Sequence, residues 1–290
     1  MEALLHQVCG GVAIGFVYAS LALALVTVHR VTRIVNFAQG EMALASAYLA
    51  WALLDAGLPY WLAFAITIAA SFGLGVVVER AVVRPATRGS PMTVVIVLIG
   101  SMLVLNSVVG WIFGYDARPF PSPFPAEPPF GNRYLSGHEA GTIAVTLAVL
   151  GFVYSFFRFT RLGLALRAVA DNPESARLVG VRVARMRALG WGLAAALGAV
   201  AGCLVAPTLF LDPSMMSGAL LYAFAAALVG GIDSPGGAVV GGIGLGVLEN
   251  LAGAYVVGTD LKQTTALAAI VGTLVLRPRG LFGRDAAVRV

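Results

Sequence analysis

Charged residues are scarce in this sequence. Asp, Glu, Lys and Arg make up 11% of its 290 residues, whereas an ordinary soluble domain carries about 25%. So few charges could not cover the surface of a chain of this size in water. Apolar and aromatic residues reach 59%, and the mean hydropathy is +0.89. The composition excludes a water-soluble globule and predicts a chain surrounded by lipid.

Lysine, histidine and cysteine are rarer still, and their scarcity removes several classes of enzyme. Lys262 is the only lysine and is followed by Gln263, so the chain has no G-x-x-x-x-G-K-[ST] phosphate loop. The three histidines are scattered without metal-ligand spacing, and no G-x-S-x-G nucleophile elbow occurs. Cys9 and Cys203 lie in or beside apolar runs and are interpreted as small hydrophobic residues. We predict a protein that is not an enzyme and uses neither cofactor nor metal.

What the sequence does contain is long apolar runs. A helix needs about 20 mainly apolar residues to cross a bilayer. Nine runs approach this length and predict an all-α polytopic membrane protein with eight or nine crossings; they are 8–28, 34–54, 61–78, 93–113, 141–157, 189–209, 215–232, 238–257 and 263–276. The last spans only about 21 Å, which leaves eight crossings open. Cations follow the first run instead of preceding it, unlike a signal peptide, so we expect this run to remain as a helix.

The arginines predict the orientation of these helices. With the N-terminus outside, the inner segments would be 29–33, 79–92, 158–188, 233–237 and the C-terminal tail. Sixteen of the eighteen arginines fall in them, and only Arg118 and Arg133 lie in outer loops. This is the positive-inside pattern of a multi-pass membrane protein. It predicts a periplasmic N-terminus and a cytoplasmic C-terminus, and it favours orientation signals over a nucleic-acid-binding patch.

The longest inner segment, 158–188, has the signals of a short helix. Asn172 is a good N-cap, Pro173 suits the first helical position, and Glu174 favours the positive helix N-terminus. Gly180 stands where such a helix would end. These signals predict a helix at about 173–179 on the inner face. A solvated loop is the simpler interpretation, but the capped structure favours a docking element.

Polar residues interrupt several apolar runs and are candidates for a translocation pathway, because such groups are costly in hydrocarbon and usually face a cavity or protein. The candidates are Asn36, Gln39, Glu41, Asn106, Glu249 and Asn250. For the first three, at the inner end of the second run, capping of the helix at the interface is an equal alternative.

Glycine and proline each gather in one region. Residues 230–246 contain eight glycines, and small residues spaced four apart allow close helix packing. We favour packing and a tight turn over a conduction role for the residues Gly230, Gly231, Ser234, Gly237 and Gly241. The outer loop 114–140 has six prolines and is expected to be extended, either as a stiff connector or as a ledge that touches an outer partner.

Together these motifs resemble the LivH-type permeases of bacterial branched-chain amino acid importers, which belong to the ATP-binding-cassette class. The matching pieces are 15–23, 33–41, 167–180, 230–241 and the tail 276–283, so the likeness covers nearly the whole chain. The proline-rich outer loop departs from the family.

The resemblance implies that residues 1–290 form one permease domain that moves leucine, isoleucine or valine inward by alternating access. It implies that segment 158–188 docks on an ATPase through Arg167, Ala168, Asn172, Ala176 and Gly180, and that the second run lies near the path. The implied partners are a second permease, two ATPases and a periplasmic binding protein. Related permeases carry urea or short amides, and a channel or secondary transporter without an ATPase is the other alternative.

Overall fold

The computed structural model describes residues 2–125, 127, 135–256, 258, 261–277 and 279–283. Within these ranges the chain is helical without strands, and one isolated bridge pairs Arg118 with Leu211. The all-α prediction is therefore confirmed. Several residues used in the sequence predictions lie outside the described ranges: Pro128, Pro129, Phe130, Arg133, Pro278, Arg284 and Arg289.

Six helices in the described part of the chain are long and apolar enough to cross a membrane. They are α1 (Glu2–Thr32), α3 (Tyr60–Val78) with its continuation, α5 (Pro91–Phe113), α6 (Gly137–Phe159), α9 (Val183–Leu209) and α11 (Pro235–Tyr255). The polytopic class is confirmed, and the count of eight or nine crossings stays a prediction.

The remaining helices are shorter. Those in or beside the predicted spans are α2 (Gln39–Asp55), α10 (Met215–Gly230) and α12 (Lys262–Leu276). α3 runs on through the π-helix η1 (Glu79–Val83) into α4 (Arg84–Ala86), while α7 (Arg161–Asp171) and α8 (Pro173–Leu178) occupy the predicted inner segment. A π-helix is rare and often marks a functional position.

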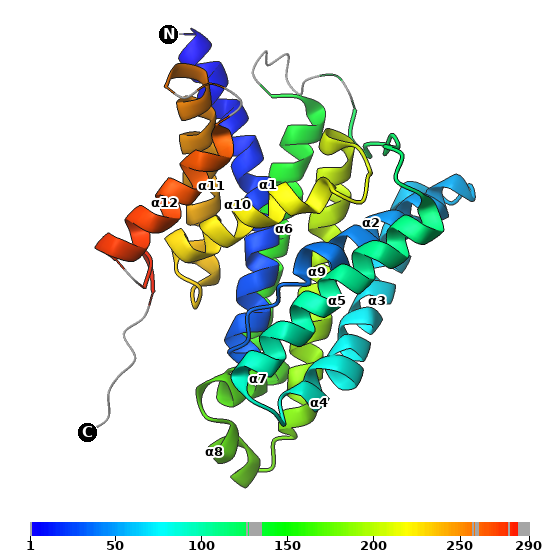
Figure 1. Ribbon diagram of the computed structural model, residues 1–290, viewed down its shortest axis with the longest axis vertical. Helices are drawn as coiled ribbons and strands as arrows, with labels where there is room; N and C mark the ends of the chain where they lie inside the picture. The colour runs from blue at the N-terminus through cyan, green and yellow to red at the C-terminus, as the bar shows by residue number, and fades with distance from the viewer. Residues whose placement is uncertain are drawn as a thin grey trace.

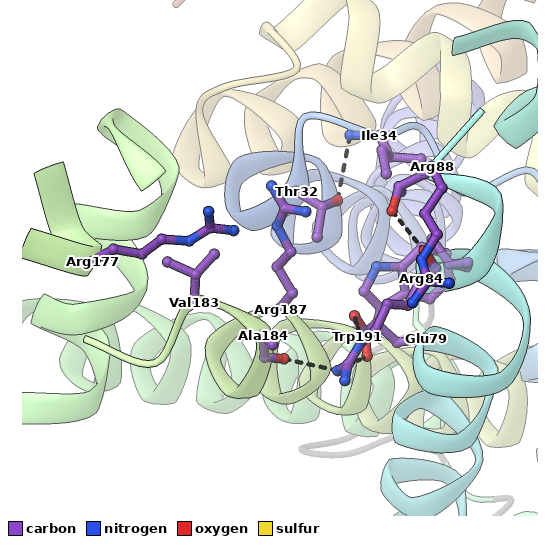
Figure 2. Close-up of a pocket in the computed structure, with 12 residues that line it drawn as sticks. Thr32, Ile34, Glu79, Arg84, Arg88, Arg177, Val183, Ala184, Arg187 and Trp191 are labelled. Carbon is purple, nitrogen blue, oxygen red and sulfur yellow. Dashed lines mark hydrogen bonds and ion pairs between the residues drawn. The ribbon is translucent and has the colours of Figure 1, made fainter. Parts of the chain in front are cut away.

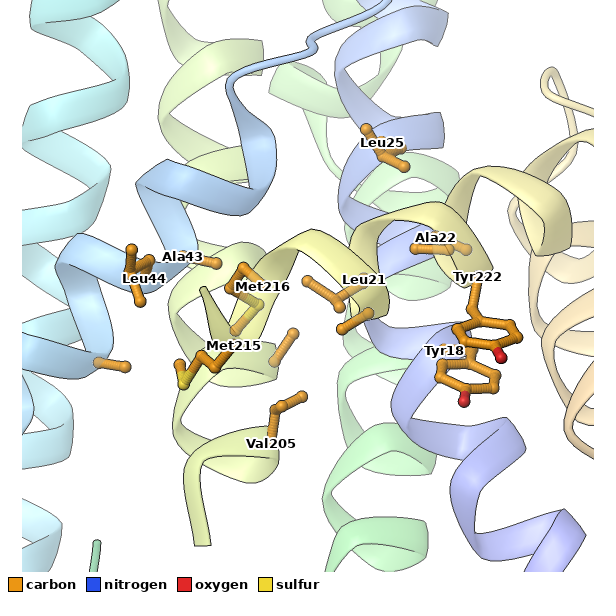
Figure 3. Close-up of a cluster of buried hydrophobic side chains, with 14 of the residues drawn as sticks. Tyr18, Leu21, Ala22, Leu25, Ala43, Leu44, Val205, Met215, Met216 and Tyr222 are labelled. Atoms are coloured by element: carbon orange, nitrogen blue, oxygen red, sulfur yellow. The ribbon is translucent and has the colours of Figure 1, made fainter. Parts of the chain in front are cut away.

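Helix α1 is the element around which the others pack. It contacts α11, α9, α10 and α6, and α3 lies against α9. In Figure 1, α1 and α6 run along the long axis, α10 crosses obliquely, and α7 and α8 lie at the end opposite the N-terminus. The largest buried cluster joins α1, α2, α9 and α10, with Leu21, Ala43 and Met216 among its members (Figure 3).

The boundary predicted for the second apolar run is wrong. Helix α2 begins at Gln39, not at residue 34, because residues 33–38 leave the helical conformation. Arg33 has a φ of 58°, and the Asn36 side-chain oxygen accepts a hydrogen bond from the Ala38 N–H at 3.0 Å. Asparagine side chains compete with helical backbone bonds in this way. The break separates α1 from α2 and places Asn36 in a turn.

Glycines allow two pairs of helices to pack with their backbones in direct contact. A Cβ on Gly246 of α11 would lie 2.5 Å from the Gly11 carbonyl oxygen of α1. On the other side of α11, Gly241 faces the Ala226 carbonyl of α10, where a Cβ would lie 2.3 Å from that oxygen. Any larger side chain at either glycine would push a neighbouring helix away.

The segments predicted to be inner lie together at one end of the molecule. Arg33, after α1, forms an ion pair of 2.7 Å with Asp233 in the turn before α11. Arg84 donates to the Ala184 carbonyl oxygen at 3.0 Å, which joins α4 to the start of α9. This grouping is what a single cytoplasmic face requires.

Candidate functional site

Helices α7 and α8 form a compact element at the predicted inner face. Asn172 caps α8, since its Oδ1 accepts from the Glu174 and Ser175 N–H groups at 3.0 Å each. Pro173 is the first residue of the helix, and Gly180 follows it with a φ of 84°. The predicted short helix is therefore confirmed. Helix α7 was not predicted; its signal was the amphipathic spacing of Gly163, Leu166 and Val169, which are buried.

A small hydrophobic cluster fixes α8 to its neighbours. Ala176 is 2% exposed and packs with Val169 of α7 and Val183 of α9, and the half-buried Ala168 packs against this cluster. Among the residues predicted to couple to an ATPase, Ala168, Asn172, Ala176 and Gly180 thus shape the element.

The outer surface of α8 ends in two apolar side chains. Leu178 is 89% exposed and Val179 is 78% exposed, and α8 projects at the lower end of the molecule in Figure 1. Large apolar side chains beside charged residues at a protruding tip are typical of a docking surface. Neither residue is among the sequence-predicted coupling residues. The available signal was an apolar pair between Arg177 and Gly180 in a strongly basic segment.

Arg167, the fifth predicted coupling residue, lies away from this tip. It lines a groove of about 560 Å³ together with Arg30 of α1, Arg158 of α6 and the first residues of α11. Its Nε atom is buried and has no hydrogen-bond partner among the described residues. The structure therefore separates Arg167 from the four residues that shape α8.

A second pocket, of about 240 Å³, opens between η1, α4, α8 and the start of α9. Figure 2 shows four arginine side chains around it, from Arg84, Arg88, Arg177 and Arg187. Its one carboxylate, that of Glu79, is 3% exposed and is held by the Arg84 guanidinium through Nε at 3.2 Å and Nη2 at 2.6 Å. This ion pair ties the π-helix to α4 and leaves the pocket with a net positive charge.

The candidate pathway residues fall into separate groups, and the first is internal. Asn36 donates to the Gln39 Oε1 at 3.0 Å, and Gln39 donates to the Ala194 carbonyl oxygen of α9 at 3.0 Å. Both side chains are fully buried. Gly198 makes room for them, since a Cβ there would lie 2.4 Å from the Gln39 amide nitrogen. This group connects α2 to α9 and presents no free polar atom to a pathway.

The second group joins three separate parts of the chain. Asn106 of α5 donates to the Glu41 carboxylate at 3.0 Å and to the Pro213 carbonyl oxygen at 2.7 Å. Glu41 is 6% exposed, and Asn106 is half-buried on the exposed helix α5. The carboxylate has no cationic partner among the described residues. Among the predicted pathway residues, Glu41 is thus the carboxylate held by a single amide, and its role in a pathway stays a prediction.

The third group lies between α1, α10 and α11. The Tyr18 hydroxyl donates to the Glu249 carboxylate at 2.8 Å, and the Tyr18 ring stacks on Tyr222 with centroids 4.6 Å apart (Figure 3). The next residue, Asn250, donates to the Gln7 carbonyl oxygen at 2.7 Å. Both polar side chains of α11 are thus engaged with α1, as interhelical hydrogen bonds in membrane proteins commonly are.

In the glycine-rich turn between α10 and α11, the backbones of the two helices approach each other closely. The Ser234 side chain caps α11 by accepting from the Gly237 N–H at 3.0 Å. Gly230 and Gly237 face each other so closely that a Cβ on either would meet the other's carbonyl oxygen, and Gly231 has a φ of 105°. These positions pack helices together and line neither of the two cavities described above.

A bundle of apolar helices with buried polar groups and a basic segment at one end is the fold of a multi-pass membrane protein. The family model "Branched-chain amino acid transport system / permease component" matches residues 8–276, and the chain belongs to that family. This confirms the predicted family and makes the chain a transport component of a membrane, not an enzyme.

Two relatives match over nearly the whole of both chains. The chain is 30% identical to the high-affinity branched-chain amino acid transport system permease protein LivH of Escherichia coli, covering 99% of this chain and 97% of that protein. It is 29% identical to the corresponding permease protein BraD of Pseudomonas aeruginosa, with coverage of 99% and 98%. A solved structure, PsaBC from Streptococcus pneumoniae in complex with Fab, shows a likeness in fold alone: TM-score 0.50 and 12% identity over 94% of this chain and 92% of that one.

Proposed function

We propose that residues 1–290 form the single permease domain of an ATP-driven importer that moves branched-chain amino acids into the cytoplasm. Two relatives at about 30% identity over nearly the full length bear this substrate in their names. The chain supplies a path and a lever, while partner subunits hydrolyse ATP. Alternating access then follows from two arrangements of the helices whose balance the partners shift.

The tip of α8 carries this proposal. Leu178, the last residue of α8, and Val179 after it are exposed, and the cluster around Ala176 holds the end of the helix in a fixed position. The apolar tip formed by Leu178 and Val179 fits into a groove of a cytoplasmic ATPase. Movement of the ATPase then passes through α8 to α7 and α9. The full assembly we propose has this permease, a second similar permease, two ATPases and a periplasmic binding protein.

The test is a substitution at the apolar tip of α8. Leu178→Ser leaves the Ala176 cluster intact but removes most of the apolar contact, so we expect ATP-driven leucine uptake in proteoliposomes to fall about tenfold or more. Co-purification of the ATPases should weaken in parallel. The matched control is Leu209→Ser at the opposite end of α9, where the leucine is also exposed.

Two results would contradict the proposal. If Leu178→Ser and Leu209→Ser both transported leucine like the unchanged chain, α8 would not be the lever. If uptake proceeded without ATPase subunits and followed an ion gradient, the chain would be a secondary transporter.

A further inference from the structure

The groove that contains Arg167 has a polar end and an apolar wall. Three guanidinium groups, from Arg30, Arg158 and Arg167, stand at one end beside Pro235 and Gly236, which begin α11. The wall belongs mainly to α6, where Leu147, Leu150, Gly151, Val153, Tyr154 and Phe157 line it.

The charge at the polar end is of one sign. No aspartate or glutamate lines the groove among the described residues, and the nearby Asp233 is held by Arg33 at 2.7 Å. The N-terminus of the 21-residue helix α11 adds a partial positive charge. The buried Nε of Arg167 has no partner there, and a buried unsatisfied donor normally indicates a missing acceptor.

The length of the wall matches one leaflet of a bilayer. From Leu147 to Arg158 the rise along α6 is about 16 Å, close to half of the roughly 30 Å hydrocarbon core. Arg30 and Arg158 lie near the ends of α1 and α6, the level expected for lipid headgroups, and Arg167 of α7 lines the same groove. Leu147 and Tyr154 are 50% and 60% exposed, so the wall is open from the side.

We propose that this groove is a binding site for an anionic phospholipid of the cytoplasmic leaflet. The phosphate accepts hydrogen bonds from Arg158 and Arg167, and an acyl chain lies along α6 over Gly151. Basic pockets at the inner ends of transmembrane helices bind anionic headgroups by this chemistry. The proposal rests on the predicted orientation of the chain and does not depend on its transported substrate.

The bound lipid would act on the docking element formed by α7 and α8. Arg30, Arg158 and Arg167 come from α1, α6 and α7, so one headgroup bridges three helices. Helix α7 carries α8 through the cluster of Val169 and Ala176. A lipid at this position stiffens the base of the docking element.

Native mass spectrometry of the purified transporter in neutral detergent tests the site, with phosphatidylglycerol and phosphatidylcholine as the two probes. We expect phosphatidylglycerol to bind about tenfold tighter or more, and Arg158→Gln to weaken it about fivefold. Arg161→Gln removes an equal charge from a residue outside the groove and should leave binding unchanged.

A pair of glycine variants tests the acyl wall. A Cβ at Gly151 meets nothing within 4 Å, so the side chain of Gly151→Phe starts in open space at the groove wall; we expect at least a tenfold loss of phosphatidylglycerol binding. Gly73→Phe on α3 is equally open and should bind normally. Equal binding of the two lipids, or equal binding by both glycine variants, would overturn the proposal. So would displacement of the lipid by glycerophosphoglycerol or inorganic phosphate, which would indicate a site for a free anion.

Discussion

The two buried carboxylates of the predicted membrane region differ in what holds them. Glu249 accepts from the Tyr18 hydroxyl within a packed interface of three helices. Glu41 is held only by the Asn106 amide, which also binds a backbone carbonyl. A weakly held carboxyl group can exchange its partner for the ammonium group of a passing amino acid.

We therefore expect Glu41→Gln to lower leucine uptake about tenfold or more, because a hydrogen bond to a charged group contributes about 1.5–3 kcal/mol. Glutamine keeps the size and an acceptor oxygen, so the contact with Asn106 is retained. The measurement is initial uptake in proteoliposomes at equal amounts of folded transporter.

Glu249→Gln is the matched control for that experiment. Its amide oxygen can still accept from Tyr18, so uptake should stay within about twofold. If Glu249→Gln abolished uptake while Glu41→Gln did not, the pathway would lie between α1 and α11 instead of beside α5.

At the scale of helices, the contact of α1 with α11 depends on the absence of side chains. A Cβ on Gly246 would lie 2.5 Å from the backbone of both Gly11 and Gly15. We expect Gly246→Ala to lower the free energy of unfolding by about 1–3 kcal/mol, since overpacking forces backbones apart. Thermal unfolding of the purified protein measures this, and Gly244→Ala on the open side of α11 should cause no loss.

Signals within a few residues determine some elements of this fold, and contacts between distant segments determine others. The caps of α8 at Asn172 and Gly180 act within one turn, and the sequence predicts them correctly. The start of α2 depends on the side chain of Asn36 replacing backbone bonds, which apolar run length does not register. The partner of Glu41 is Asn106 of α5, which also binds the Pro213 carbonyl before α10, so no local pattern could bring these residues together.

At the scale of the whole molecule, the short helix α12 decides on which side the tail lies. Residues 279–283 turn back to the end of α10, where the Leu281 N–H donates to the Val229 carbonyl oxygen at 2.8 Å. A Cβ on Gly231 would lie 2.7 Å from the Gly283 nitrogen. The tail and the turn before α11 therefore lie side by side, and a membrane that separated them would cut through these contacts.

This contact predicts that the tail is cytoplasmic, together with α8. We expect a membrane-impermeant maleimide to label Leu281→Cys and Ser175→Cys only after the inner membrane is permeabilised, and Ser122→Cys in intact spheroplasts. Cys9→Ala and Cys203→Ala remove the native thiols first. Labelling of Leu281→Cys from outside would place the tail in the periplasm and break the positive-inside pattern at Arg277 and Arg279. Labelling of all three from one side would overturn the orientation of the whole chain.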